Sequence, residues 1–202
     1  QSILSKSHNS MNPIIHSFEP LKTEFDIMFN KFSKDKDVFL NNFALGEKIG
    51  NAEFNVAKNS ATSSFNKFNK NSKWIKVRSS EQETTPENFT TKQIVKIDTV
   101  DSYCENNNVD RIDLLKIDTQ GYEDKVLEGC FHILKNNKVG AIVTEIMFDN
   151  VYDKHFSFSD IEKYLIPNNF RMVGIDLANN NLFSGIVFFA DVYYFNKKHY
   201  KL

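Results

Sequence analysis

Glycine, cysteine and long apolar runs are scarce in this chain of 202 residues. It contains 7 glycines, and none precedes Gly46, so the GxGxxG turn of a nicotinamide-dependent dehydrogenase is absent. No segment approaches the roughly 20 apolar residues that cross a bilayer, and no secretory signal peptide is visible. These absences argue against a dehydrogenase and predict a chain without a membrane span.

Cysteine and charge are also limited. The two cysteines, Cys104 and Cys130, form no CxxC pair, and each lies among apolar helical positions. We interpret both as buried reduced thiols rather than as a disulfide or a metal site, which predicts a cytoplasmic protein. No metal-ligand spacing occurs among the His, Cys and acidic residues, so no metal is expected. The net charge of −1 argues against a nucleic-acid partner, because phosphate binding needs clustered cations.

Hydrophobic patterning predicts an α/β domain in which strands and helices alternate. Short apolar runs predict strands at 14–18, 38–45, 112–117, 141–148, 172–175 and 186–195. Alternation with amphipathic helices indicates a mostly parallel sheet with helices on both faces. The connection at 178–181 is too short for a parallel crossover, so a closing antiparallel hairpin is expected. A single helix is predicted from Gly121 to Leu134, and Ser159 with Glu162 is a plausible capping box for the next helix.

Residues 47–98 depart from this alternation. Ala52, Phe54 and Val56 alternate with polar residues, as in a half-exposed strand. Two more short strands are predicted at 74–77 and 94–97, with a polar loop at 58–73. We interpret 47–98 as an antiparallel insertion or flap within one domain that spans 1–202.

Three acidic residues fall at the carboxyl ends of predicted strands, where open parallel sheets bind their ligands. Glu19 ends the first strand, Asp118 ends IDLLKI, and Glu145 lies late in AIVTEIMF. Each alone can equally be a helix cap or a solvated loop residue, but three on one edge favour a ligand site. An unpaired charge inside an apolar strand is costly, so Glu145 is expected near the strand's exposed end or paired. A structural role that anchors the neighbouring loop stays open beside a catalytic one.

Histidines add one further candidate. His155 lies in the loop at 149–157, which follows the Glu145 strand and is placed to reach a substrate. It is a candidate general base or substrate contact, and a solvated loop histidine is the alternative. His16 is expected on a sheet face or in the core, and His132 on an exposed helix face.

The residues LLKIDTQGYEDKVLEG (114–129) resemble the signature of the FkbM-type methyltransferases. IIHSFEP (14–20), NNFALGEKIGNAEFNV (41–56) and IVTEIMF (142–148) resemble further segments of that family in the same order. The resemblance covers nearly the whole chain. It implies a Rossmann-like class I methyltransferase fold, with a seven-stranded sheet whose last strand is antiparallel. It also implies S-adenosylmethionine as cofactor and O-methylation of sugar or secondary-metabolite hydroxyls.

The resemblance also implies residue roles. Glu19 would bind the ribose hydroxyls of the cofactor. Ala44 and Leu45 would lie near its adenine, and Asp118 beside its methionine end or the substrate. The partner would be a small-molecule or glycan acceptor.

The implied reaction is in-line displacement of the sulfonium methyl by a hydroxyl oxygen. The methyl donor is already activated, so the enzyme mainly supplies positioning and a base for the hydroxyl proton. Asp118 and Glu145 are the first candidates for this base, and His155 is the second.

One family segment has no counterpart in the chain. The family has a first strand followed by an Asp-x-Gly-Ala-Asn-x-Gly loop, and Gln1 is expected to come just after that loop. The 202-residue chain is therefore predicted to bind S-adenosylmethionine weakly or not at all, and the full-length protein to bind it. Micromolar affinity of this chain by calorimetry would refute that. A methyltransferase fold kept as a non-catalytic scaffold or binding protein is the alternative function.

Overall fold

The structure is a computed structural model that describes residues 13–148, 150–154, 157–177 and 189–200. The chain divides into two compact units, residues 1–44 and residues 45–202, and each is described by itself. The described strands form three hydrogen-bonded sheets, β1–β2, β3–β5–β4 and β6–β7–β9–β8. Strands pair in both directions, so the fold is mixed α/β. A single seven-stranded Rossmann-like sheet stays a prediction.

The first unit is a strand–helix–strand element. β1 (Ile15–Phe18) and β2 (Val38–Asn41) pair in parallel, and α1 (Lys22–Phe32) connects them, as a parallel pair requires. The strand predicted at 38–45 is interrupted, since β2 ends at Asn41 and β3 (Ala44–Leu45) is separate. The chain bends at Asn42, whose side-chain amide donates hydrogen bonds to the carbonyl oxygens of Glu19 and Pro20.

The second unit contains a four-stranded sheet. β6 (Ile112–Ile117) and β7 (Val139–Met147) pair in parallel. β9 (Phe189–Asn196) lies between β7 and β8 (Phe170–Asp176) and runs antiparallel to both. The predicted antiparallel arrangement of the last two strands is therefore confirmed. The connection at 178–181 on which that prediction was based lies outside the described residues.

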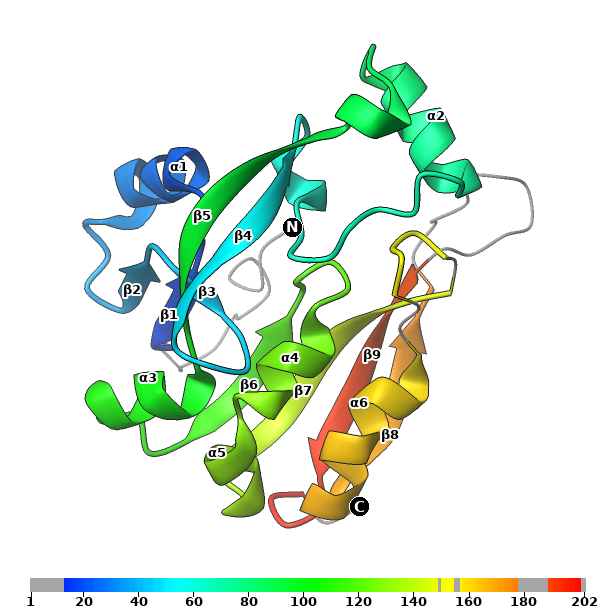
Figure 1. The fold of residues 1–202 in the computed structure, drawn as a ribbon. Coiled ribbons are helices and arrows are strands. Elements are labelled where there is room, and N and C mark those ends of the chain that lie inside the picture. The colour runs from blue at the N-terminus through cyan, green and yellow to red at the C-terminus, as the bar shows by residue number, and fades with distance from the viewer. Residues whose placement is uncertain (1–12, 149, 155–156, 178–188, 201–202) are drawn as a thin grey trace. The chain divides into compact units, whose positions relative to one another are not determined.

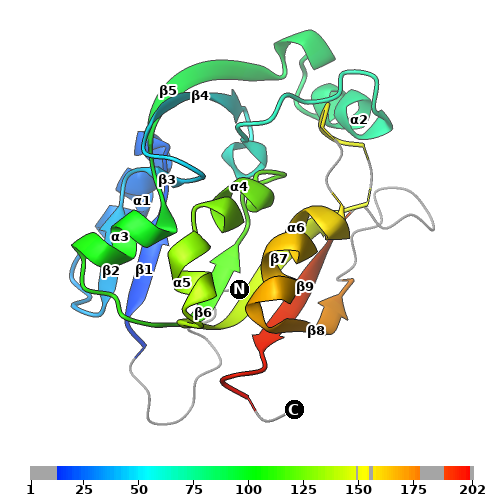
Figure 2. The same cartoon turned by 60° about the horizontal axis from the view of Figure 1, so that its bottom comes forward.

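Three helices cover one face of this sheet: α4 (Glu123–Glu128), α5 (Phe131–Lys135) and α6 (Phe158–Leu165) (Figures 1 and 2). Leu127, Leu134 and Ile161 pack from these helices into a core that includes Ile142 and Tyr194 of the sheet. A further helix, α3 (Val100–Asn106), precedes β6 and adds the buried Val100 and Cys104 to the same core. No helix in the described part of the chain is long and apolar enough to cross a membrane.

Two helix predictions need correction. The helix expected from 121 to 134 is two helices, because the chain turns at Gly129–Cys130 between α4 and α5. The capping box of α6 is formed by Ser157 and Asp160, not by Ser159 and Glu162. The backbone N–H of Ser157 donates to the Asp160 carboxylate at 2.9 Å, which starts the helix earlier than periodicity alone indicates.

Gly129 ends α4 at a point where two backbones meet. A Cβ atom built on Gly129 would lie 2.1 Å from the carbonyl oxygen of Gly46, far inside van der Waals contact. The two nearest atoms belong to the backbone of Gly46, so a side-chain movement cannot relieve the clash. The glycine that closes the 114–129 segment is therefore required by packing.

Replacing Gly129 by Ala is expected to lower the free energy of unfolding by about 3 kcal/mol, because it overpacks a site with no room. Gly174→Ala in β8 is the matched control, since its added Cβ would lie 3.7 Å from the nearest atom, a side-chain carbon of Tyr193. It should change stability by less than about 1 kcal/mol. Urea unfolding measures both, and equal effects would contradict the packing argument.

Residues 47–98 form a long antiparallel ribbon with a helix beyond it (Figure 1). β4 (Gly50–Ala57) pairs with β5 (Thr90–Asp98) over its whole length. The segment between them carries η2 (Ser60–Thr62), α2 (Lys73–Glu81) and η3 (Pro86–Asn88). The antiparallel ribbon agrees with the predicted strands at 52–56 and 94–97, whereas the strand predicted at 74–77 is wrong.

The reason for a helix at 73–81 lies in its first turn and its buried side. The hydroxyl of Ser72 accepts the backbone N–H of Ile75 at 3.2 Å, which caps the helix. Ile75 and Ser79 are both buried and are four residues apart, as on one face of a helix. The short, mostly apolar run from Trp74 to Val77 suggests a strand only when these four residues are considered alone.

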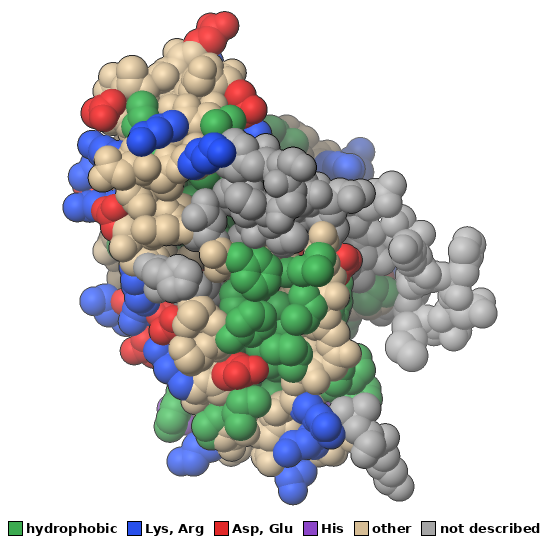
Figure 3. All heavy atoms as spheres, turned by 90° about the vertical axis from the view of Figure 1, so that its right-hand side faces the viewer, with side chains coloured by type: hydrophobic (Ala, Val, Ile, Leu, Met, Phe, Trp, Pro, Cys, Tyr) green, Lys and Arg blue, Asp and Glu red, His purple; other side chains and the backbone are tan. Residues whose placement is uncertain are grey.

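An edge of the four-stranded sheet is exposed and apolar. Among the described strands, β8 pairs only with β9. Val173 and Ile175 of β8 are 43% and 46% exposed. Hydrophobic side chains gather on the side of the molecule shown in Figure 3.

Candidate active site

Two of the predicted acidic residues meet at one edge of the four-stranded sheet. Asp118 directly follows β6, and Glu145 lies near the end of β7, which is parallel to β6. The side-chain amide of Gln120 joins them, because its Nε2 lies 3.1 Å from Asp118 Oδ1 and 3.0 Å from Glu145 Oε2. The structure therefore brings Asp118 and Glu145 together through a residue that the sequence did not single out.

The loop that carries Gln120 is held tightly. Gln120 and Gly121 have positive φ angles of 57° and 89°, a conformation that a residue with a side chain rarely adopts. Glu123 Oε1 accepts the backbone N–H groups of Thr119 and Gly121 at 2.9 and 3.2 Å. The hydroxyl of Ser64 donates to the carbonyl oxygen of Gln120 at 2.7 Å. These contacts fix an unfavourable backbone geometry at the site, as is common for functional loops.

Glu123 is thus an anchor of the loop. Its side chain is 1% exposed, and burial raises the pKa of its carboxyl to about 7. The backbone hydrogen bonds from Thr119 and Gly121 oppose this shift, because they favour the ionised form.

Glu123→Ala is expected to lower the free energy of unfolding by about 2–4 kcal/mol at pH 7, because it leaves two buried N–H groups without an acceptor. Glu123→Gln is the matched control. Both N–H groups donate to the same oxygen, so an amide oxygen can replace it, and a loss below about 1 kcal/mol is expected. Urea unfolding distinguishes them, and equal losses would show that Glu123 does not act through these bonds.

The Glu145 carboxyl holds its proton unusually strongly. Glu145 is 7% exposed, and this burial is the largest cause of its raised pKa of about 8. The negative charges of Asp118 and Glu123 raise the pKa further. Lys116 opposes the shift and forms an ion pair with Asp118, with 2.8 Å between Nζ and Oδ2. Two adjacent carboxyl groups therefore differ in surroundings: Asp118 is ion-paired and half exposed, and Glu145 is buried. Such a difference is typical of acid–base sites.

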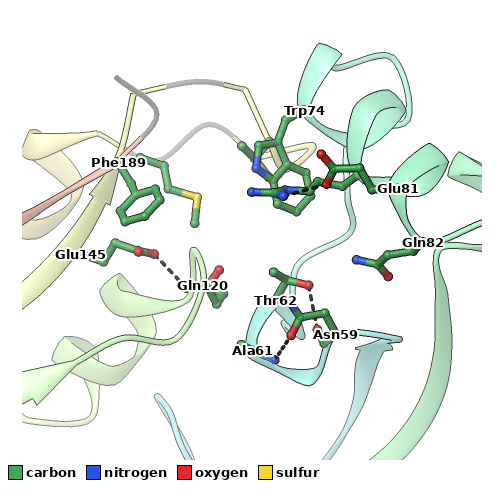
Figure 4. Close-up of a pocket in the computed structure, with 12 residues that line it drawn as sticks. Asn59, Ala61, Thr62, Trp74, Glu81, Gln82, Gln120, Glu145 and Phe189 are labelled. Atoms are coloured by element: carbon green, nitrogen blue, oxygen red, sulfur yellow. Dashed lines mark hydrogen bonds and ion pairs between the residues drawn. The ribbon is translucent and has the colours of Figure 1, made fainter. Parts of the chain in front are cut away.

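A cavity of about 430 Å³ opens beside Glu145 (Figure 4). Glu145, Phe189 and Gln120 line one side of it, and Asn59 and Thr62 line its base in that view. Asp118 does not line it. Of the two carboxylates that Gln120 joins, Glu145 is therefore the one that a molecule in this cavity would meet.

One face of α2, together with the residue just after it, forms the opposite wall. Trp74, Arg78, Glu81 and Gln82 line the cavity at the spacing i, i+4, i+7, i+8. That spacing places them on the same side of a helix. This spacing in the sequence could have predicted that the four side chains share one helix face. The strand predicted at 74–77 prevented that interpretation.

Glu19 lies in the first unit, at the carboxyl end of β1. Its Oε1 accepts the backbone N–H of Leu21 at 2.7 Å, and burial raises the pKa of its carboxyl. Its Oε2 has no hydrogen-bond partner among the described residues, so the side chain keeps an acceptor for a ribose hydroxyl and fits the role that the resemblance implies. Ala44 and Leu45 form β3. Convergence of Glu19 with Asp118 and Glu145 stays a prediction.

His155 lies outside the described residues. Cys104 and Cys130 are free and buried, as predicted from their apolar neighbours. Burial raises the pKa of both thiols, so neither is an activated nucleophile. Within the described ranges, no group of three or more His, Cys, Asp or Glu side chains could hold a metal ion.

Comparison with known proteins decides the family. The model of the methyltransferase FkbM domain matches residues 2–172. The chain belongs to the FkbM methyltransferase family. No curated protein and no solved structure matches it.

Within this FkbM methyltransferase domain, the matched residues include Glu19, Asp118, Gln120 and Glu145. They also include the whole of α2, so the cavity wall lies within the region that defines the family. Phe189 is the one cavity residue named above that lies beyond the match.

Proposed function

We propose that the protein transfers a methyl group from S-adenosylmethionine to a hydroxyl group of an acceptor bound in the cavity. The observation that carries this proposal is Glu145: a buried carboxyl of raised pKa at the end of a parallel strand, facing a cavity of suitable size. A base with a pKa near the working pH is the most effective acceptor of a hydroxyl proton.

The family resemblance implies which residues would contact the cofactor. Glu19 would accept hydrogen bonds from the ribose hydroxyls, and Ala44 and Leu45 would lie beside the adenine. Asp118 would lie near the methionine end, where its carboxylate complements a cationic amino group. When bound, S-adenosylmethionine supplies a methyl group already activated by its sulfonium charge.

The protein's residues then act on the acceptor. Ionised Glu145 would accept the proton of the acceptor hydroxyl, whose oxygen would receive the methyl group while the cofactor's sulfur leaves as a thioether. Gln120 donates to Glu145 Oε2 and so holds the carboxylate in position for this transfer. Asp118 forms an ion pair with Lys116 beside the site. His155 in the loop at 149–157 is the second candidate for the base.

The cavity lining supports a hydroxyl-rich acceptor of sugar-like size. Asn59, Thr62 and Gln82 provide amide and hydroxyl groups that can both donate and accept hydrogen bonds. Trp74 and Phe189 provide apolar ring surface against which a pyranose ring can pack. A few polar groups placed among apolar walls are typical of small-molecule sites.

The test uses the full-length protein, S-adenosylmethionine labelled in its methyl group, and a panel of mono- and oligosaccharides. Label should appear on a sugar in a base-stable linkage, because an ether survives alkali and a methyl ester does not. Calorimetry on the same protein measures cofactor binding independently. Binding of S-adenosylmethionine without base-stable label on any sugar would favour the non-catalytic scaffold instead.

A further inference from the structure

The wall of the cavity opposite Glu145 carries a positively charged side chain. Of the described residues that line it, Arg78 is the one with a positive charge. Its guanidinium carbon lies 5.9 Å from the centre of the Trp74 ring, within reach of a cation–π interaction. Its Nη1 lies 2.7 Å from Glu81 Oε2. Trp74 stacks on Phe68, with an angle of 2° between the rings, so the surface that supports Arg78 is itself fixed.

These contacts orient the guanidinium and leave most of it available. Arginine has five N–H donors, and the bond to Glu81 is the one hydrogen bond that Arg78 makes among the described residues. Its side chain is 37% exposed. A planar guanidinium held on an aromatic ring can present its remaining N–H groups to two oxygens of one anion.

Charge in the rest of the cavity does not oppose an anion. Glu81 is already paired with Arg78, and the other lining carboxyl, Glu145, is largely protonated at neutral pH. An exposed ion pair such as Arg78–Glu81 contributes little stability, so sharing the guanidinium with a second anion costs little. In Figure 4, Glu81 and Trp74 lie across the cavity from Glu145. A bound acceptor can therefore place a hydroxyl at Glu145 and an anionic group at Arg78.

We propose that Arg78 determines acceptor specificity by binding a carboxylate or phosphate group on a sugar-like acceptor. This inference rests on the proposed function in taking the cavity as the acceptor site. The chemistry requires an oxyanion on the same molecule as the methylated hydroxyl. Uronic acids and sugar phosphates both satisfy it.

The experiment measures binding to the protein without methyl transfer. D-glucose, D-glucuronate and D-glucose 6-phosphate are titrated by NMR against the wild-type protein and the variants Arg78→Gln and Lys76→Gln. Lys76 is the matched control, because it is an exposed cation on the same helix that does not line the cavity. Far-UV circular dichroism and thermal unfolding establish that each variant is folded.

The wild-type protein should bind at least one anionic sugar about 10-fold or more tighter than glucose, the factor expected for a charge-assisted hydrogen bond. Arg78→Gln should reduce that affinity to the level of glucose, and Lys76→Gln should leave it unchanged. The anion with the higher affinity identifies the group as carboxylate or phosphate.

Equal binding of all three sugars, no binding of either anionic sugar, or a preference that survives in Arg78→Gln would overturn the proposal. Its failure is separable from failure of the proposed function. Equal binding of the three sugars together with methyl transfer would contradict the anion site and support the O-methyltransferase. An Arg78-dependent preference for anionic sugars without any methyl transfer would support the anion-selective sugar site and contradict the proposed enzymatic function.

Discussion

Replacing Glu145 by Gln is expected to lower kcat for methyl transfer by about 10²–10⁴-fold, the usual contribution of a general base. Gln keeps the size of the side chain and an oxygen that can accept from Gln120 Nε2, so the loop should stay in place. The variant loses only the ability to take a proton. The measurement is the initial rate of S-adenosylhomocysteine formation by the full-length protein at saturating acceptor.

The pH profile provides the sharper test. The wild-type rate should rise through pH about 8 as Glu145 ionises, and the Gln variant should lack that rise. Asp118→Asn is the control at the adjacent carboxylate. Asp118 does not line the cavity, so this change should raise the KM for the cofactor more than it lowers kcat. Unchanged turnover in both variants would contradict this mechanism. His155 would then be the remaining candidate for the general base.

The same Glu145→Gln change is expected to stabilise the protein at alkaline pH. The pKa of Glu145 is about 8 in the folded protein, against an ordinary value of 4.5, so the folded protein keeps a proton that the unfolded chain has released between these values. The wild-type free energy of unfolding therefore falls as pH rises from about 4.5 to about 8. At roughly 1.4 kcal/mol for each pKa unit, the loss from this group is on the order of 4–5 kcal/mol.

Urea unfolding of wild type and Glu145→Gln at pH 5, 7 and 9 measures this effect. The variant should be close to wild type at pH 5 and more stable by several kcal/mol at pH 9. Glu123 shifts in the same direction, to a pKa of about 7, and is present in both proteins, so the difference between them measures Glu145 together with its electrostatic coupling to Glu123. A stability difference that does not change with pH would contradict the burial of an ionisable Glu145. A gain in stability combined with a loss of turnover would show that this buried carboxyl serves function at the expense of stability.

The pairing of Asp118 with Glu145 could be predicted because it follows from strand order. Each residue lies at the carboxyl end of an apolar run, and parallel strands bring those ends to one edge. The partner of both residues could not be predicted in this way. Gln120 contacts Glu145 across 25 positions of the chain, and its left-handed backbone conformation depends on Glu123 and Ser64.

The segment at 73–81 shows why local patterns fail over short lengths. Trp74, Ile75 and Val77 suggest a strand when only four residues are considered. The N-cap at Ser72 and the burial of Ile75 and Ser79 on one side stabilise a helix instead. This difference matters for function, because only a helix places Trp74 and Arg78 on one wall of the cavity.

The family, most strands, the antiparallel end of the sheet and the two carboxylates at its edge could all be predicted from the order of the amino acids. These follow from periodicity and chain order, which are local properties. Three features became apparent from the folded chain alone: the raised pKa of Glu145, the anchoring of the loop by Glu123, and the cavity that α2 lines with Arg78. Those features depend on burial and on contacts between residues far apart in the chain, and neither is encoded in any short stretch of residues.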